Sequence, residues 1–161
     1  MRTNNGFSFT LWDVGHGLAI WIKTPAGHNH WIDAGQNSDT DFSPAERVAK
    51  YWKESKLDYL IISHPDADHI GGLPDVIKYL KKPRVLSRNK SLPKIEKYGK
   101  EEKEYQRVFA DLDRRYNIRI PYMSSPLNPN YNGGVTVKTG YLEYSEATKT
   151  NDTSVVALYL F

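Results

Sequence analysis

The stretch from Leu60 to Gly72 constrains this chain more than any other part of its sequence. A short apolar run, Tyr59 to Ile62, predicts a buried β-strand. It leads into a loop that holds two imidazoles and two carboxylates within six residues: His64, Asp66, Asp68 and His69. The glycine pair that follows allows a tight turn before the next helical pattern. All four side chains can ligate a divalent cation, and the mixture of His and Asp suits zinc or manganese better than a soft metal. The loop is therefore predicted to bind metal.

A simpler interpretation of such a loop has to be weighed against the metal site. A single His-x-Asp is most often a solvated turn in which the Asp caps the following helix. Two His and two Asp behind one buried strand, closed by two glycines, favour the metal site over that interpretation.

Composition sets the broad class of the protein. A chain of 161 residues fits one domain, 1–161, with a sizeable core. The net charge of +3 does not by itself indicate a nucleic-acid partner, because the basic residues are not confined to one block. The absence of cysteine excludes disulfides and thiolate metal sites. No apolar run is long enough to span a membrane, and the polar start Met1 to Asn5 lacks a signal-peptide core, so a cytoplasmic protein is expected.

The periodicity of the chain predicts mixed α/β layers. Alternating residues predict an antiparallel opening, and strands then alternate with helical patterns. Ser43, Pro44 and Glu46 give one helix a capping-box start, and the segment 87–100 is predicted to be a surface loop. The predicted strands are 7–12, 18–23, 30–32, 59–62, 84–86, 118–123, 135–144 and 154–161, and the predicted helices are 44–55, 74–80 and 101–116.

Two further sets of polar residues leave alternatives open. Asp13 and Asp33 lie at predicted strand ends, where they serve either a site or a turn. A basic set either borders a phosphate-bearing substrate or forms only a solvated surface; it comprises Arg84, Arg88, Lys90, Lys94, Lys97 and Lys100.

Several segments resemble the motifs of metallo-β-lactamase-fold hydrolases. The resemblance is closest to the hydrolase domains attached to bacterial DNA-uptake (competence) channels. It is carried by Asp13-Val14-Gly15-His16-Gly17, then Ile32-Asp33-Ala34-Gly35, then Ser63 to Gly72, in the order and spacing of the family. Asn151-Asp152-Thr153-Ser154 before an apolar strand resembles a later motif of that branch.

The resemblance implies an αββα sandwich with a two-metal site at one edge of its sheets. The positions matching His64 and Asp66 would hold a first metal, and those matching Asp68 and His69 a second. Asp68 would also hold the attacking water, whose pKa two metals would lower. Asp33 would orient a ligand. Most relatives have His at the position of Asp66, and an Asp there makes manganese a rival to zinc.

The chain departs from the family at its C-terminal side. A complete member has a bridging Asp in a Gly-Asp step after the strand that matches 154–161, and a late His. The histidine of the middle motif would fall near Asn151. The chain is therefore expected to be the N-terminal portion of the fold, with too few protein ligands for efficient hydrolysis alone. It would be a fragment, a half completed by a second chain, or a degenerate member.

These observations predict a metal-dependent hydrolase that acts on a phosphodiester or nucleic-acid substrate. Two alternatives stay open: a non-catalytic binding or partner module that retains the fold, and a small-molecule ester or lactam hydrolase. The apolar strand 154–161 would leave a sheet edge open to pairing. It predicts a homo-oligomer or a complementing chain.

Overall fold

A five-stranded sheet forms the centre of the protein. The computed structural model describes residues 6–37, 39–90, 103–116, 136–140 and 154–160. The sheet has the order β1-β2-β3-β4-β5, with antiparallel pairing from β1 to β3 and parallel pairing from β3 to β5. Its strands are β1 (Ser8–Leu11), β2 (Ile20–Lys23), β3 (Asn29–Ile32), β4 (Tyr59–Ile61) and β5 (Val85–Ser87).

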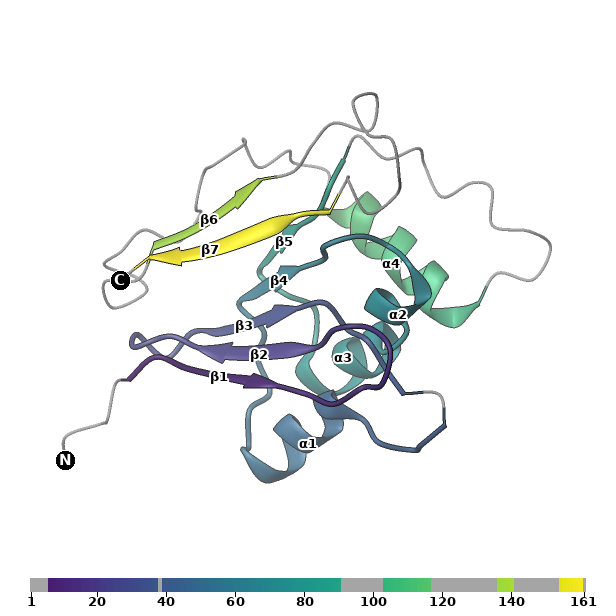
Figure 1. Cartoon of the computed structure of the whole chain (residues 1–161), viewed down its shortest axis with the longest axis horizontal. Helices are drawn as coiled ribbons and strands as arrows, with labels where there is room; N and C mark the ends of the chain where they lie inside the picture. The colour runs from purple at the N-terminus through teal and green to yellow at the C-terminus, as the bar shows by residue number, and fades with distance from the viewer. Residues whose placement is uncertain (1–5, 38, 91–102, 117–135, 141–153, 161) are drawn as a thin grey trace.

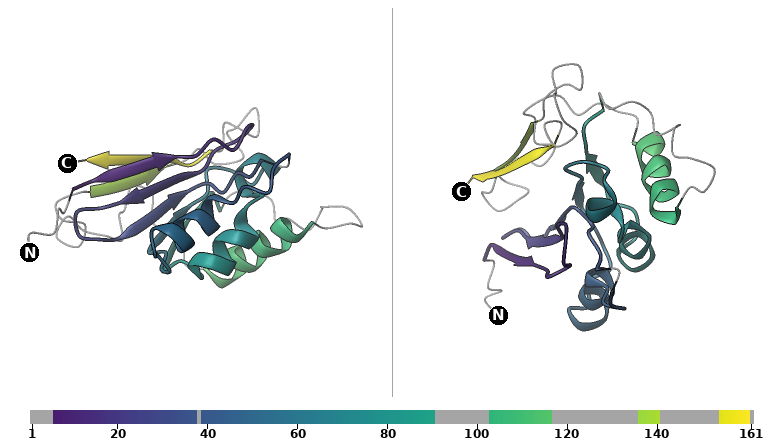
Figure 2. Two further views of the ribbon diagram at one scale, coloured as in Figure 1. Left: turned by 90° about the horizontal axis from the view of Figure 1, so that it is seen from below. Right: turned by 45° about the vertical axis from the view of Figure 1, so that its right-hand side comes forward.

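Helices cover one face of this sheet (Figures 1 and 2). They are α1 (Pro44–Tyr51), α2 (Ala67–Ile70), α3 (Leu73–Leu80) and α4 (Glu104–Arg115). The capping predicted for α1 is present, because Ser43 Oγ accepts the Glu46 amide at 3.2 Å and Pro44 begins the helix. No helix in the described ranges combines the length and the hydropathy that a membrane crossing requires.

A second, two-stranded sheet lies against the other face (Figure 2, right). It pairs β6 (Thr136–Gly140) with β7 (Val156–Leu160) in antiparallel register. A backbone hydrogen bond joins the two sheets, from the Val155 amide to the Ser63 carbonyl at 2.8 Å. The described residues thus form one helix layer and two sheet layers, an α/β architecture in accord with the predicted sandwich.

The alternation of side chains along β4 explains why both faces of the central sheet are covered. Leu60 packs into the core beneath the helices, with Trp31 and Leu86 from the neighbouring strands. Tyr59 and Ile61 point the other way and pack with Val155 between the sheets. All three β4 residues are fully buried, as expected of a central parallel strand.

The structure corrects three details of the predicted elements. The stretch predicted to bind metal is not only loop, because α2 forms one helical turn within it. The helix predicted over 44–55 ends at Tyr51, with Trp52 as its C-cap. The predicted surface loop 87–100 begins in the interior, where Ser87, Arg88 and Asn89 are buried. The strand predicted over 118–123 lies outside the described residues.

Candidate metal centre

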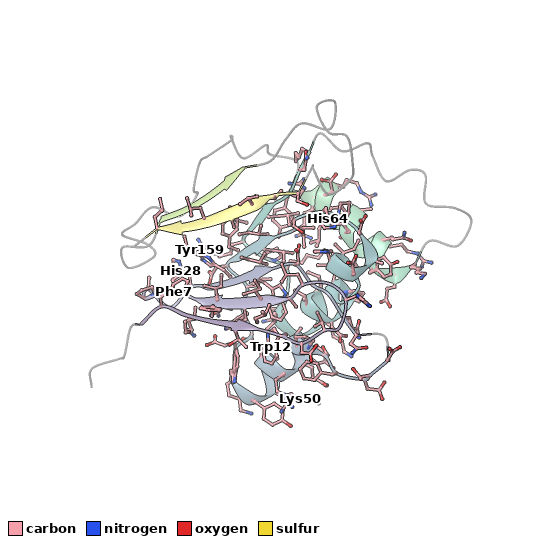
Figure 3. All side chains as sticks on the ribbon, viewed as in Figure 1. Phe7, Trp12, His28, Lys50, His64 and Tyr159 are labelled. Carbon is pink, nitrogen blue, oxygen red and sulfur yellow. The ribbon has the colours of Figure 1, made fainter. Side chains whose placement is uncertain are left out.

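The candidate site lies where the parallel strands of the central sheet end. Asp33 follows β3, and Ser63 and His64 follow β4, so neighbouring strands deliver their polar residues to the same sheet edge. Carboxyl ends of parallel strands are the usual place for functional groups in such sheets. Figure 3 shows His64 at the opposite end of the molecule from His28 and Phe7.

Three of the four predicted ligands converge. One ligand atom each of His64, Asp68 and His69 lies within 4.8 Å of the others. The two imidazole rings are 3.9 Å apart between centroids. Asp68 Oδ2 lies 3.5 Å from Nε2 of His69. Donors this close on separate side chains have the spacing that a single cation requires.

Asp66, the fourth predicted ligand, is outside this group of three. Its Oδ2 lies 3.5 Å from Nε2 of His64, and its side chain is exposed at the start of α2. Asp66 is the N-cap residue of α2, yet its side chain makes no capping hydrogen bond. The carboxylate therefore faces His64, and its role as a ligand stays a prediction.

Asp33 lies beneath the surface of the site and contacts Ser63 and His69. It is fully buried, and it adopts φ 53°, a left-handed conformation that Asp tolerates better than most residues. Its Oδ1 accepts the Ser63 amide at 2.6 Å, while its Oδ2 lies 2.6 Å from Ser63 Oγ and 2.8 Å from His69 Nδ1. The predicted orienting role of this carboxylate thus has a geometric basis in the contact with His69.

Two serine hydroxyls contact Nδ1 of His64, the nitrogen that in His69 contacts Asp33. Ser63 Oγ lies 3.0 Å from His64 Nδ1, and Ser154 Oγ lies 3.2 Å from the same nitrogen. No local pattern in the sequence indicates a role for either hydroxyl. Ser154 precedes β7, so the segment that leads into the second sheet contacts the candidate site directly.

These contacts distinguish the two nitrogens of each ring. Nδ1 of both histidines faces the buried polar groups, and Nε2 of both faces an aspartate carboxylate. A proton on His69 Nδ1, donated to Asp33, leaves the Nε2 lone pair available for a cation. The hydrogen bond with Asp33 raises the pKa of His69, whereas burial and the neighbouring His69 lower the pKa of His64.

The three resembling motifs meet at the backbone of Asp68. Its carbonyl oxygen accepts the Leu18 amide at 3.4 Å and packs against Gly17 and Gly35. A Cβ on Gly35 would lie 2.5 Å from this oxygen, and a Cβ on Gly17 would lie closer still. Glycine at both positions therefore permits the close approach, so the two early motifs add this packing to the Asp33 contact with His69.

The structure describes part of the two sets of polar residues for which the sequence left alternatives open. Asp13 Oδ1 accepts the Gly15 amide at 3.1 Å, which is a turn-forming contact. Arg88, from the predicted basic set, is buried: Nε contacts Asp113 Oδ1 at 2.6 Å and Nη2 contacts the Asp113 and Tyr116 carbonyls. It holds α4 to the sheet and is not part of a solvated surface. Arg84 pairs with Asp58, while Lys94, Lys97 and Lys100 lie outside the described residues.

Comparison with known proteins agrees with this arrangement. A family profile described as the metallo-beta-lactamase superfamily matches residues 12–160. The protein named Competence protein ComA from Neisseria gonorrhoeae is 34% identical over 76 residues, which cover 46% of this chain. The chain spans only a tenth (10%) of the length of that relative.

Proposed function

Because this chain belongs to the metallo-β-lactamase superfamily, we propose that it is a metal-dependent hydrolase whose centre is built from His64, Asp68 and His69, with Asp66 beside them. One observation carries the proposal. The ligand atoms of the first three residues lie within 4.8 Å of one another. Nδ1 of His69 already contacts the Asp33 carboxylate, and Nδ1 of His64 already contacts the hydroxyls of Ser63 and Ser154.

The donor set fits a borderline-hard divalent cation. Two imidazole nitrogens and one or two carboxylates suit zinc, and each carboxylate increases the affinity for manganese. Asp68 and Asp66 are partly exposed, with side-chain exposures of 46% and 47%, so water reaches this side of the site. When bound, the metal supplies a Lewis acid that makes water a nucleophile near neutral pH.

Each side chain then has a defined task in hydrolysis. His64 and His69 hold their rings with Nε2 toward the aspartates, and Asp33 fixes the orientation of His69. We assign the attacking water to Asp68, whose carboxylate accepts its proton. The water oxygen forms the new bond to phosphorus, the bond from phosphorus to the leaving oxygen breaks, and that oxygen takes up a proton.

We propose a phosphodiester, such as a nucleic-acid strand, as the substrate. Support comes from the match to a competence protein and from the resemblance of the sequence motifs to hydrolase domains of DNA-uptake channels. A cytoplasmic location is proposed with it, as expected from the sequence.

Elemental analysis combined with a phosphodiester assay tests the function. The purified chain is expected to carry zinc or manganese. Because it has few protein ligands, we expect it to hydrolyse bis(p-nitrophenyl) phosphate only slowly, at a rate that is higher with added Mn²⁺ than with EDTA. Asp68→Asn should abolish this metal-dependent rate. Asp41→Asn is the matched control, because Asp41 is an exposed aspartate remote from the ligands in sequence.

The outcomes separate the alternatives. Bound metal without turnover of any phosphodiester, but with turnover of an ester or lactam, would favour the small-molecule hydrolase. A chain that binds no metal would favour the non-catalytic module.

We also propose that β7 pairs with a second copy or a complementing chain. Its outward residues Val156, Leu158 and Leu160 are exposed by 68%, 52% and 39%. Apolar side chains on such a strand favour association. Light scattering should show a dimer at micromolar concentration that dissociates when Leu158→Lys is introduced. If the protein were monomeric at every concentration that light scattering can measure, the proposed pairing would be contradicted.

A further inference from the structure

A cleft of about 700 Å³ lies beside the candidate metal centre. Asp68 forms part of its wall, so the cleft and the candidate centre share a residue. Ligand-binding clefts usually measure roughly 300–1,000 Å³, which exceeds what a bare phosphate ion needs. The cleft therefore has room for an organic group attached to the bond that is cleaved.

The turn between β1 and β2 supplies His16 to this cleft. The turn is held by the Asp13 side chain on the Gly15 amide, and Gly15 and Gly17 adopt positive φ on either side of His16. Packing of Gly17 against the Asp68 carbonyl brings this turn to the centre. The imidazole of His16 is exposed and takes no part in the group of three ligands.

The segment after β3 supplies a polar wall. Asn37 and Asp39 line the cleft, and Asn37 Oδ1 accepts the Asp39 amide at 2.9 Å. Asp39 is exposed, and within the described ranges its carboxylate forms no ion pair. A carboxylate of this kind is a natural acceptor for the hydroxyl groups of a sugar.

The start of α4 closes the cleft with a cation and an aromatic ring. Lys103 Nζ lies 5.9 Å from the centroid of the Tyr105 ring, and both side chains line the cleft. Tyr105 is half-buried and packs against the main core, so its ring is held in place. Among the described residues, no carboxylate forms an ion pair with Lys103, and its side chain is exposed.

We propose that this cleft binds one nucleotide unit of the substrate, with Lys103 and His16 on the phosphate, Asp39 on the sugar hydroxyls and Tyr105 against the base. The inference rests on the proposed hydrolytic function and assigns the substrate group that this function acts on. A single lysine and one imidazole fit one phosphate; a site that follows a long strand would need several cations. Aromatic rings stack on every base, so the site distinguishes nucleotides from other esters more than one base from another.

Calorimetric titration with adenosine 5′-monophosphate, adenosine and inorganic phosphate tests this assignment. The nucleotide should bind at least about tenfold more tightly than either part, because phosphate and nucleoside contacts act together. Lys103→Ala should weaken nucleotide binding about tenfold and leave adenosine binding unchanged, as expected for a charge-assisted hydrogen bond to phosphate. Lys56→Ala, which removes an exposed lysine elsewhere, is the matched control.

Tyr105 is tested with two variants, since its ring also packs against the core. Tyr105→Ala and Tyr105→Leu should both weaken adenosine binding, and circular dichroism identifies any variant that fails to fold. Equal nucleotide affinity in Lys103→Ala and Lys56→Ala, or a nucleotide that binds no better than phosphate, would overturn the assignment. The titrations are run with Mn²⁺ and with EDTA, and the metal content is measured in parallel. A chain that carries no metal then contradicts the proposed hydrolytic function. The titration in EDTA still measures whether the cleft binds the nucleotide.

Discussion

The Oδ2 atom of Asp33 lies 2.8 Å from Nδ1 of His69, and the carboxylate that makes this contact is completely buried. A charge in this position is tolerated because Ser63 donates to both of its oxygens. The pairing fixes which nitrogen of His69 carries the proton and leaves the other for a cation.

Replacement of this carboxylate should therefore weaken metal binding without removing a ligand. For Asp33→Asn we expect a loss of about 10- to 100-fold in zinc affinity, the usual effect of losing a group that orients a ligand. Competition with a chromophoric chelator measures it. Asp41→Asn controls for the loss of one negative charge, and an affinity equal to that control would show that Asp33 does not orient His69.

The glycines of the site allow a matched test of close packing. Gly17 and Gly27 both have positive φ, at 108° and 82°, but only Gly17 has the Asp68 carbonyl against it; nothing lies within 4 Å of a Cβ built on Gly27. Gly27→Ala should cost about 1–2 kcal/mol of unfolding free energy from backbone strain alone. Gly17→Ala should cost more and should also reduce metal affinity, because Asp68 must move. If Gly17→Ala and Gly27→Ala lowered the unfolding free energy equally in urea and left metal affinity equal, Gly17 would have no packing role at Asp68.

His30 should make the fold sensitive to acid. The ring is buried between the sheets, with Nδ1 3.0 Å from the Tyr159 hydroxyl and Tyr59 edge-on to it. Burial, reinforced by His28 and partly opposed by Asp58, lowers the pKa of His30 to about 4. The folded protein therefore binds fewer protons than the unfolded chain between pH 4 and 6.5, and the stability that neutral His30 contributes is lost as pH falls through this window.

The size of the effect follows from the same shift. A difference of 2.5 pKa units corresponds to at most about 3 kcal/mol between pH 6.5 and 4. Urea denaturation across this range, compared with His30→Gln, isolates the contribution because carboxylates titrate in both proteins. If the unfolding free energy of His30→Gln fell with pH as steeply as that of the wild type, His30 would not be the cause of the acid sensitivity.

Arg88 should behave as a structural residue. Its guanidinium binds the Asp113 side chain and the carbonyls of Asp113 and of Tyr116, the C-cap of α4, and the side chain is only 4% exposed. Arg88→Ala leaves those acceptors unsatisfied and should cost about 2–3 kcal/mol of unfolding free energy. Arg84→Ala breaks an exposed pair with Asp58 at 3.4 Å and should have little effect. Thermal denaturation distinguishes them, and similar melting temperatures for both variants would refute the structural role.

Local sequence patterns were sufficient to predict the central elements. Three predictions depend only on neighbouring residues: the buried strand that begins at Tyr59, the Ser43 cap of α1 and the antiparallel pairing of the first strands. Each of these features is present in the structure. The candidate ligands were proposed for the same reason, since His64, Asp68 and His69 lie within one short segment. The structure brings one ligand atom of each within 4.8 Å of the others.

Contacts between distant segments were not predictable from those patterns. Ser154 reaches His64 across 90 residues of sequence, and a serine before an apolar strand has no distinctive periodicity. Arg88 looked like part of a basic surface because its partner Asp113 lies 25 residues away on another element. The fit of Gly17 to the Asp68 carbonyl likewise depends on how the turn between β1 and β2 packs against α2, which a turn-forming glycine does not indicate by itself.

The hydrogen bond from Val155 to Ser63 has a consequence for the order of assembly during synthesis. The residues from 63 to 69 leave the ribosome long before residues 154 and 155, so the nascent segment lacks both this backbone contact and the hydroxyl that faces His64. The contacts that hold the Ser63–His64 segment in place are therefore completed only after the second sheet has emerged and docked against the first.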